Sequence, residues 1–415
     1  MKIIKPHILL IFFLNIFFKS NSQTINQIFD EGLTLKKSGN CLSAIEKFNK
    51  ILSIDKNYYD AWYEKAECLF LTKKYDEAIE TLNNLLKINS KHIKGRLLKA
   101  KILITKNKNT EAIEDLKKIL LLDDKNLEAL ELLIIAYLKF PDKKNTLINE
   151  LLKAKALNSK NPLIYYKLSE HYKEKKQYEQ ALENINTAIK LDSNSYEFYF
   201  FRATINYEIN NCLEVIKDLS NLIKRNFVSE KILEIRADCA LRLKQYEIAL
   251  SDYSRILSEF NKNKVEIYIR RGKIYSLLDN PQKAINDYSK AIYINPTVDS
   301  IYLMRAEEYL KLGKSKINLA IKDLKKVIEL NSNNYKAFLK LGILHIEKKR
   351  FYEALQYLDK SIKINPTAEA YFYRGAIYYE MNDLKNSCLD LQKAKNLGYE
   401  KAQEILEKFC MNFNK

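Results

Sequence analysis

Six cysteines are the residues of this 415-residue sequence whose type and spacing most suggest chemistry. Cys41 is followed by Cys68, and Cys212 is followed by Cys239, at the same separation of 27 residues. Cysteine thiolates bind metal ions, act as nucleophiles and join into disulfides. Because no Cys-x-x-Cys motif is present, the spacing alone leaves all three roles open.

The histidines beyond the first twenty residues are isolated from one another. They are His92, His171 and His345, and none lies four residues from another or within an HExxH motif. The sequence has no GxSxG motif, and its eight glycines are not clustered into a phosphate-binding loop. We therefore expect structural roles for these histidines, and we predict that the chain is not an enzyme and holds no metal and no cofactor.

Five arginines are each followed by an aspartate at a nearly constant separation. The pairs are Arg202 and Asp218, Arg236 and Asp252, Arg271 and Asp287, Arg305 and Asp323, and Arg374 and Asp390. One interpretation is a row of arginines that lines a groove for an acidic ligand. However, both partners disappear together where Leu341 and Tyr357 stand, and the signs are exchanged at Glu31 and Lys47. We therefore expect each arginine to hold its own aspartate, an arrangement specific enough in geometry to fix the register of two helices.

These residues belong to a repeat that runs along nearly the whole chain. A small or apolar residue recurs about every 33 to 36 residues, at Ala44, Ala78, Ala112, Thr146 or Leu147, Ala181, Val215, Ala249, Ala284, Ala320, Ala354 and Ser387. A period of this size is typical of stacked supersecondary units. With only eight glycines and six prolines, the composition also favours helices over strands.

The repeat resembles the tetratricopeptide repeat, a unit of two amphipathic helices. In residues 265–296 the matching residues are Tyr268, Gly272, Tyr275, Ala284, Tyr288, Ala291 and Pro296. The second repeat carries the family's tryptophan at Trp62, followed by Ala66 and Ala78. The resemblance implies an all-α, right-handed superhelical solenoid of about eleven units, closed by a C-terminal capping helix at residues 399–412.

The repeat boundaries follow from the same pattern. The eleven units are predicted at residues 25–58, 59–92, 93–126, 127–161, 162–195, 196–229, 230–264, 265–298, 299–334, 335–367 and 368–398. The fourth unit departs most from the pattern because Pro141 interrupts it. The ninth has two extra residues in its turn.

The resemblance also implies where a partner would bind. In this family the first helix of each repeat lines a concave groove, and positions two, five, nine and twelve point into it. The aromatic residues on these positions are Tyr63, Phe70, Tyr166, Phe200, Tyr207, Phe372 and Tyr379. Exposed aromatic side chains bury much area at low entropic cost, which suits them to a peptide or a helix. The alternative is that some belong to the core, because periodicity does not separate neighbouring faces.

The repeat register places four of the cysteines at equivalent positions of their repeats. Cys41 and Cys212 occupy position seventeen, at the start of a second helix. Cys68 and Cys239 occupy position ten of the following repeat, on a helix that packs antiparallel to the first in this fold. We predict three structural disulfides, in preference to buried thiols or a metal site: Cys41–Cys68, Cys212–Cys239 and Cys388–Cys410.

Residues 1–22 have the pattern of a secretory signal peptide. A basic start precedes an apolar run from Ile8 to Phe18, and small residues follow at Ser20 and Ser22. A retained anchor is the alternative, although the run is shorter than the roughly 20 residues that span a membrane. We expect no transmembrane span after removal of the signal and a periplasmic or secreted location. The absence of a usable Asn-x-Ser/Thr site favours a bacterial host.

The net charge of +18 is spread over the whole sequence, which favours solvated helix faces over a nucleic-acid surface. The leading hypothesis is a non-catalytic scaffold that binds peptide or helical segments of protein partners in the groove outside the cytoplasm. The alternative is a soluble envelope protein that binds an anionic non-protein ligand such as a glycan. The identity of the partner and the oligomeric state stay open.

Overall fold

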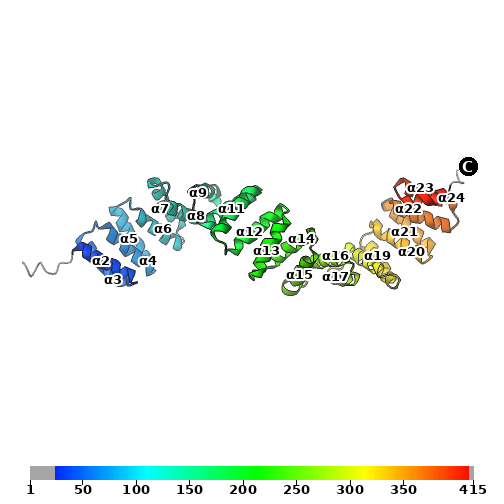
Figure 1. Cartoon of the computed structure of the whole chain (residues 1–415), viewed down its shortest axis with the longest axis horizontal. Coiled ribbons are helices and arrows are strands. Elements are labelled where there is room, and N and C mark those ends of the chain that lie inside the picture. Colours follow the sequence, from blue (N-terminus) through cyan, green and yellow to red (C-terminus); the bar gives the residue numbers. More distant parts are fainter. Residues whose placement is uncertain (1–23, 411–415) are drawn as a thin grey trace, which may run out of the picture. The chain divides into compact units, whose positions relative to one another are not determined.

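The computed structural model describes residues 24–410, which form 23 α-helices and no strand (Figure 1). The predicted all-α fold class is therefore confirmed. The predicted signal peptide, residues 1–22, lies outside the described residues. Within the described part of the chain, no helix has the length and apolar character needed to cross a membrane.

Two compact units divide the described residues, and the boundary between Ile205 and Asn206 lies inside helix α12 (Tyr196–Glu208). The helices of the first unit that precede α12 are α2 (Ile25–Lys37), α3 (Cys41–Ile54), α4 (Tyr59–Leu71), α5 (Tyr75–Ile88), α6 (Ile93–Thr105), α7 (Asn109–Leu122), α8 (Leu127–Tyr137), α9 (Lys144–Ala156), α10 (Pro162–Glu174) and α11 (Tyr178–Leu191). The helices of the second unit that follow α12 are α13 (Cys212–Lys224), α14 (Glu230–Arg242), α15 (Tyr246–Arg255), α16 (Val265–Leu277), α17 (Pro281–Ile294), α18 (Asp299–Lys311), α19 (Ile317–Leu330), α20 (Tyr335–Glu347), α21 (Phe351–Ile364), α22 (Ala368–Glu380), α23 (Leu384–Asn396) and α24 (Glu400–Phe409).

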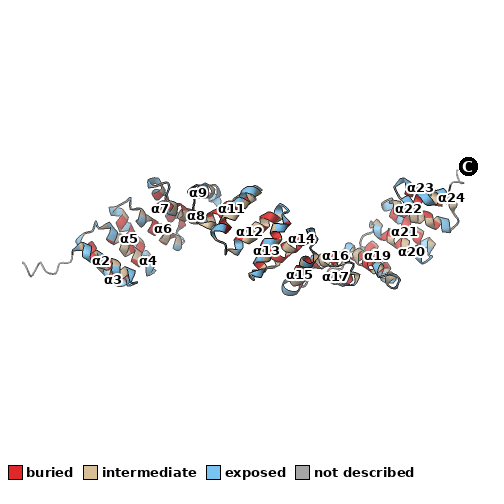
Figure 2. Ribbon diagram, in the orientation of Figure 1, coloured by how far each residue is buried: buried red, intermediate tan, exposed pale blue. Residues whose placement is uncertain are grey.

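Within each unit, consecutive helices pack against each other in pairs, from α2 and α3 to α10 and α11 in the first and from α14 and α15 to α22 and α23 in the second. Apolar residues three and four positions apart place one face of each helix toward its neighbours. In α5, for example, the buried residues include Ala78, Leu82 and Leu85. Figure 2 shows the resulting division, with buried residues where the helices meet and exposed residues on the outer faces.

A residue with left-handed backbone closes the turn between the two helices in ten of the described pairs. It always stands at position fifteen of the repeat, at Gly39, Lys73, Asn107, Lys176, Asn210, Lys244, Asp279, Gly313, Lys349 and Asn382. In the fourth repeat this position is Pro141, whose ring fixes φ near −65° and excludes the left-handed conformation. The pair α8 and α9 is therefore joined through a 3-10 turn, η1 (Pro141–Lys143).

Glycines within the first helices make room for large side chains on the second. A Cβ atom on Gly272 would lie 2.6 Å from Cε1 of Tyr288, and Gly32 stands in the same relation to Phe48. Tyr288 and Phe48 are both buried. Loss of a buried aromatic side chain typically costs about 3–5 kcal/mol, so this close approach matters to the stability of a pair.

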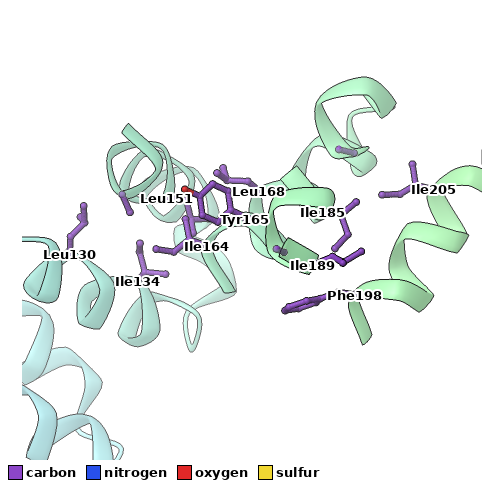
Figure 3. Packing of buried hydrophobic residues seen from close by; sticks show 13 residues of the cluster. Leu130, Ile134, Leu151, Ile164, Tyr165, Leu168, Ile185, Ile189, Phe198 and Ile205 are labelled. Atoms are coloured by element: carbon purple, nitrogen blue, oxygen red, sulfur yellow. The ribbon is translucent and has the colours of Figure 1, made fainter. Parts of the chain in front are cut away.

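The core continues from one pair to the next. In the first unit a single cluster runs from Leu130 and Ile134 of α8, through Ile164 of α10 and Ile185 of α11, to Phe198 of α12 (Figure 3). These pairs thus bury apolar surface against one another as well as within themselves, as expected of a stacked repeat.

Two irregularities interrupt the second unit. The helix α15 continues into a π-helical turn, η2 (Ile256–Phe260), which the repeat pattern did not predict. In the ninth repeat a 3-10 turn, η3 (Lys314–Lys316), follows Gly313 and holds the two extra residues.

After the last pair, α24 covers α23. Its Ala402 and the following Cys410 join Leu391 and Ala394 in one buried cluster. A capping helix was predicted at residues 399–412, of which residues 411 and 412 lie outside the described part.

Candidate functional site

The seven aromatic residues predicted to face a groove lie on first helices of four repeats: α4, α10, α12 and α22. Six of them are partly buried, and Tyr379 is exposed over 38% of its surface. None is as deeply buried as Tyr137, Tyr253 and Tyr288 in the core. These side chains therefore retain surface with which a partner can make contact.

In the first unit the predicted residues pack against other rings. Tyr63 lies 5.8 Å from the ring of His92, and Phe70 lies 6.0 Å from the ring of Tyr75, measured between centroids. Tyr166 packs between Phe198 and Phe201, at 5.1 Å and 5.2 Å. Burial raises the pKa of Tyr63 and of Tyr166, so both phenols stay protonated over the physiological range.

In the second unit Tyr207 belongs to a polar cluster. Its hydroxyl donates a hydrogen bond to Asp238, and the guanidinium of Arg242 lies 4.9 Å from its ring centroid. Asp238 also accepts hydrogen bonds from Arg242 at 2.8 Å and from Arg270 at 3.1 Å. Burial, followed by the hydrogen bond to Asp238, raises the pKa of Tyr207 to about 12. This part of the surface is thus already hydrogen-bonded within the protein.

The contact of Tyr207 with Asp238 is one case of a recurring relationship. Position twelve of one repeat donates to position nine of the next, and the pairs with this relationship are Lys36 with Glu67, Lys173 with Thr204, and Tyr207 with Asp238. Polar residues of the predicted groove therefore link neighbouring repeats, and the sequence analysis did not identify these links.

Four of the five predicted arginine–aspartate pairs form within one unit. The arginine in each uses Nε and one terminal nitrogen to bind both carboxylate oxygens, at 2.6 to 2.8 Å, in the pairs Arg236–Asp252, Arg271–Asp287, Arg305–Asp323 and Arg374–Asp390. Burial raises the pKa of Asp252, and the hydrogen bond from Arg236 opposes this effect. The sign-exchanged pair also forms, with Lys47 Nζ 2.6 Å from Glu31 Oε2.

The remaining terminal nitrogen of each arginine binds the preceding repeat. Its acceptor always occupies position twenty-five, and the acceptors are Ser220, Ser254, Ser289 and Asp359 for the four arginines in order. Each arginine therefore joins two repeats as well as two helices. The sequence carries a signal for this contact. In the ninth repeat position twenty-five is Lys325, which cannot accept a hydrogen bond, and the tenth repeat that follows has Leu341 in place of the arginine.

The fifth arginine makes the same contact with the preceding repeat. Arg202 donates to Asn186 Oδ1 at 2.7 Å within the first unit. Asp218 is buried in the second unit. Because the two residues belong to different units, the pairing of Arg202 with Asp218 stays a prediction.

The cysteines differ in part from the prediction of three disulfides. Cys388 and Cys410 form a disulfide that ties α24 to α23. Cys41, Cys68, Cys212 and Cys239 are buried free thiols, so two predicted bridges are absent from the structure. Cys68 lies in the same buried cluster as Cys41. Burial, and then the neighbouring Cys41 thiol, raises the pKa of Cys68 to about 12, and the same causes raise the pKa of Cys239 beside Cys212.

The histidines lie apart from one another. His92 caps α6, because its Nδ1 accepts a hydrogen bond of 2.9 Å from the amide of Gly95. His345 is buried beside the ring of Tyr357, and neither of its ring nitrogens has a hydrogen-bond partner. Among residues 24–410 no three His, Cys, Asp or Glu side chains are grouped as metal ligands would be.

An apolar pocket of about 430 Å³ lies in the second unit, where α20 to α24 meet (orange to red in Figure 1). Its apolar lining comes from Ile346, Phe351, Ala376, Ile377, Leu391 and Ile405. The other lining residues are Glu347, Lys349, Tyr379 and Glu380. We call this site the C-terminal pocket. Its volume is within the range of small-ligand sites and is ample for one or two side chains.

Tyr379 is the predicted groove residue that lines the C-terminal pocket. Ile346 and Ala376 also occupy groove positions, twelve and nine of their repeats, but they are aliphatic and so were not among the predicted aromatic residues. Ile405 comes from α24, which is outside the repeat pattern. The repeat register alone therefore does not predict this pocket.

Comparisons with known proteins agree with the repeat. Models of the tetratricopeptide repeat match residues 163–195, 265–298 and 303–369. A model described as anaphase-promoting complex, cyclosome, subunit 3 matches residues 37–119.

Curated relatives are similar over part of their length. A TPR repeat-containing protein of Methanocaldococcus jannaschii is 28% identical over 63% of this chain and 46% of its own length. The Hsp70-Hsp90 organizing protein of Triticum aestivum is 23% identical over 56% of this chain and 44% of its own length. The chain thus spans about half the length, or less, of the curated relatives it matches.

Two solved structures are also similar. The C-terminal part of a TPR repeat-containing protein from Cytophaga hutchinsonii is 18% identical, with a TM-score of 0.49 over 58% of this chain and 98% of that one. A tetratricopeptide repeat protein from Parabacteroides merdae is 22% identical, with a TM-score of 0.39 over 59% and 97%. Because the family models and the curated relatives agree with the helix pairs of the structure, this chain is a tetratricopeptide-repeat protein.

Proposed function

We propose that this protein is a non-catalytic scaffold that binds peptide or helical segments of partner proteins through the first helices of its repeats. The observation that carries the proposal is the C-terminal pocket, which combines a mostly apolar lining with groove positions of two successive repeats. A site of this kind fits the apolar side chain of a protein segment. The partly exposed aromatic residues of α4, α10, α12 and α22 supply further contact area.

The curated relatives support the same class of function. Their names include an Hsp70-Hsp90 organizing protein and a mitochondrial import receptor subunit, both of which describe proteins that engage other proteins. We propose in addition that the chain works outside the cytoplasm, in the periplasm or after secretion, on the strength of residues 1–22.

The alternative of an anionic non-protein ligand has less support. Arg236, Arg271, Arg305 and Arg374 are the regularly spaced cations that such a ligand would use. Each is already bound to a carboxylate within its own repeat. A guanidinium held by two hydrogen bonds is a poor free anion site.

The test is cross-linking of the full chain to its partners in the native host, followed by mass spectrometry of the linked peptides. We expect links from α20, α22 and the other first helices to defined protein segments that persist at high salt. A matched pair of variants controls the result. Tyr379→Ala should reduce the links near α22, whereas Tyr293→Ala, which removes an aromatic side chain 86% exposed on the second helix α17, should not.

Binding that disappears above the salt concentration at which surface charges are screened, and that captures only polysaccharide, would contradict the proposal. For the location, we expect the mature N-terminus to follow Ser22 and the protein to be recovered outside the cytoplasm. Recovery in the cytoplasm with Met1 retained would contradict the proposed export without affecting the scaffold function.

A further inference from the structure

We infer that the C-terminal pocket recognises an apolar side chain of a partner segment that carries a basic residue next to it. The inference rests on the proposed scaffold function and specifies the chemistry of the partner. It follows from the apolar lining of the pocket and from two carboxylates of that lining that form no ion pair among the described residues.

The floor of the C-terminal pocket is apolar and buried. Ile377 and Leu391 are buried, which fixes the floor between α22 and α23. Phe351 at the start of α21 and Ile405 of α24 complete the lining from two other helices. Because four different helices supply these residues, the site is concave, and an aliphatic or aromatic side chain entering it would lose contact with water.

Two carboxylates of this lining have no side-chain partner among residues 24–410. Glu347 and Glu380 occupy the same position, thirteen, in successive repeats. Neither forms an ion pair or a side-chain hydrogen bond with any residue in the described part of the chain. Lys349 supplies one positive charge at the same pocket, so the lining keeps a net negative charge.

Two other carboxylates on first helices of the second unit are paired, in contrast to Glu347 and Glu380. Glu307 is bound to Lys340 at 3.1 Å, and Asp238 is bound to both Arg242 and Arg270. Glu347 and Glu380 are thus available to an incoming cation, in a chain whose overall charge is +18. Charge complementarity therefore selects a lysine or arginine next to the apolar side chain.

The probe is a set of three fluorescein-labelled peptides of twelve residues that differ only at their two central positions, Leu-Lys, Leu-Glu and Ala-Lys. Anisotropy titration with the full chain measures each dissociation constant. We expect Leu-Lys to bind at least about tenfold more tightly than Ala-Lys, because the smaller side chain forgoes most of the apolar burial. We expect Leu-Lys to bind about fivefold more tightly than Leu-Glu at low salt, as charge pairs with the two exposed carboxylates allow.

Two variants locate the binding site. Ala376→Phe fills the C-terminal pocket and should abolish the preference for Leu over Ala, whereas Ala368→Phe at the other end of α22 should leave it unchanged. Glu380→Lys should remove the preference for Leu-Lys over Leu-Glu. Its matched control is Glu369→Lys, an exposed change on the same helix outside the lining, which should preserve that preference.

The possible failures can be told apart. If a peptide binds and Ala376→Phe has no effect while Tyr63→Ala does, the scaffold function stands and the inference is overturned. If no peptide binds to the unmodified chain and cross-linking also finds no protein partner, the proposed function fails with it. If Ala376→Phe instead abolishes self-association in sedimentation velocity, a second copy of the chain occupies the pocket and the inference is also overturned.

Discussion

Arg305 holds Asp323 with two hydrogen bonds of 2.8 Å, although the extra residues of the ninth repeat place the two residues 18 positions apart instead of 16. The 3-10 turn η3 contains the insertion before α19 begins, so α18 and α19 keep the register of the other pairs. The side chains of both residues are largely buried. The same guanidinium reaches Ser289 of the preceding repeat at 2.9 Å. The pair therefore connects the two helices of one repeat and also two successive repeats.

Removal of the arginine alone should be costly. Arg305→Leu leaves the buried carboxylate of Asp323 without its cation, and we expect the loss of about 3–5 kcal/mol of stability in the second unit. The double variant Arg305→Leu, Asp323→Tyr copies Leu341 and Tyr357 of the tenth repeat and should recover most of this loss. The measurement is hydrogen exchange of α18 and α19 combined in a double-mutant cycle. Arg255→Leu, which breaks a more exposed pair with Glu259, is the control and should cost much less than Arg305→Leu. The cycle is completed by Asp323→Tyr alone, and a loss in the double variant equal to the sum of the two single losses would show that the pair has no coupling.

Mild acid should destabilise the second unit through His345. Burial lowers the pKa of this histidine, and among the charged groups that face it Glu353 acts in the opposite direction while Arg350, Lys325 and Lys348 add to the effect. Because the folded pKa lies below the unfolded one, the unfolded chain takes up the proton first as the pH falls through about 6.5. Stability is thus complete above this pH and decreases below it.

We expect hydrogen-exchange protection of α20 to fall between about pH 7.5 and pH 5.5, above the range in which ordinary carboxyl groups titrate. His345→Leu should remove this fall while leaving the protection at high pH nearly unchanged. His171→Leu, in the first unit, is the comparison and should leave α20 as it is. An identical pH profile for the unmodified chain and His345→Leu would rule out His345 as the source.

The four buried thiols should react slowly in the folded protein. The raised pKa of Cys68, about 12, leaves almost no thiolate at pH 8, and the thiolate is the reactive form. We expect a thiol reagent to modify Cys41, Cys68, Cys212 and Cys239 only when denaturant is added. Oxidation of the folded chain should join Cys41 to Cys68 and Cys212 to Cys239 exclusively, as peptide mapping without reductant would show. Bonds between other partners, or rapid labelling of the folded chain, would contradict this arrangement of the thiols.

The disulfide of the last repeat should hold one wall of the C-terminal pocket. Cys388–Cys410 ties α24, which carries Ile405, to α23. A bond that closes a chain segment of this length contributes about 3 kcal/mol on the chain-entropy model. We expect the variant Cys388→Ser, Cys410→Ser to lose hydrogen-exchange protection in α24 and to bind the Leu-Lys peptide several-fold more weakly. The matched variant Cys212→Ser, Cys239→Ser should bind the peptide normally.

Residues that meet within one repeat left a readable pattern in the sequence. Arg271 and Asp287 stand at positions seven and twenty-three, and the same two positions change together to Leu341 and Tyr357 in the tenth repeat. Because every repeat folds the same way, a fixed separation along the chain becomes a fixed contact in space. Register, helix pairing and the arginine–aspartate contacts were therefore accessible without coordinates. So was the departure at Pro141, since proline cannot adopt the left-handed turn that the other repeats use.

Contacts that depend on one particular packing arrangement required the tertiary structure. The C-terminal pocket needs Ile405 of α24, which has no equivalent in any repeat, so its place beside Ile377 and Leu391 cannot follow from the period. The unpaired state of Glu347 and Glu380 depends on which side chains actually reach them. The repeated unit and the contacts inside it could be predicted from the amino-acid sequence, because local spacing sets them. The site and its free charges were decided by how the last repeats and the terminal helix pack together.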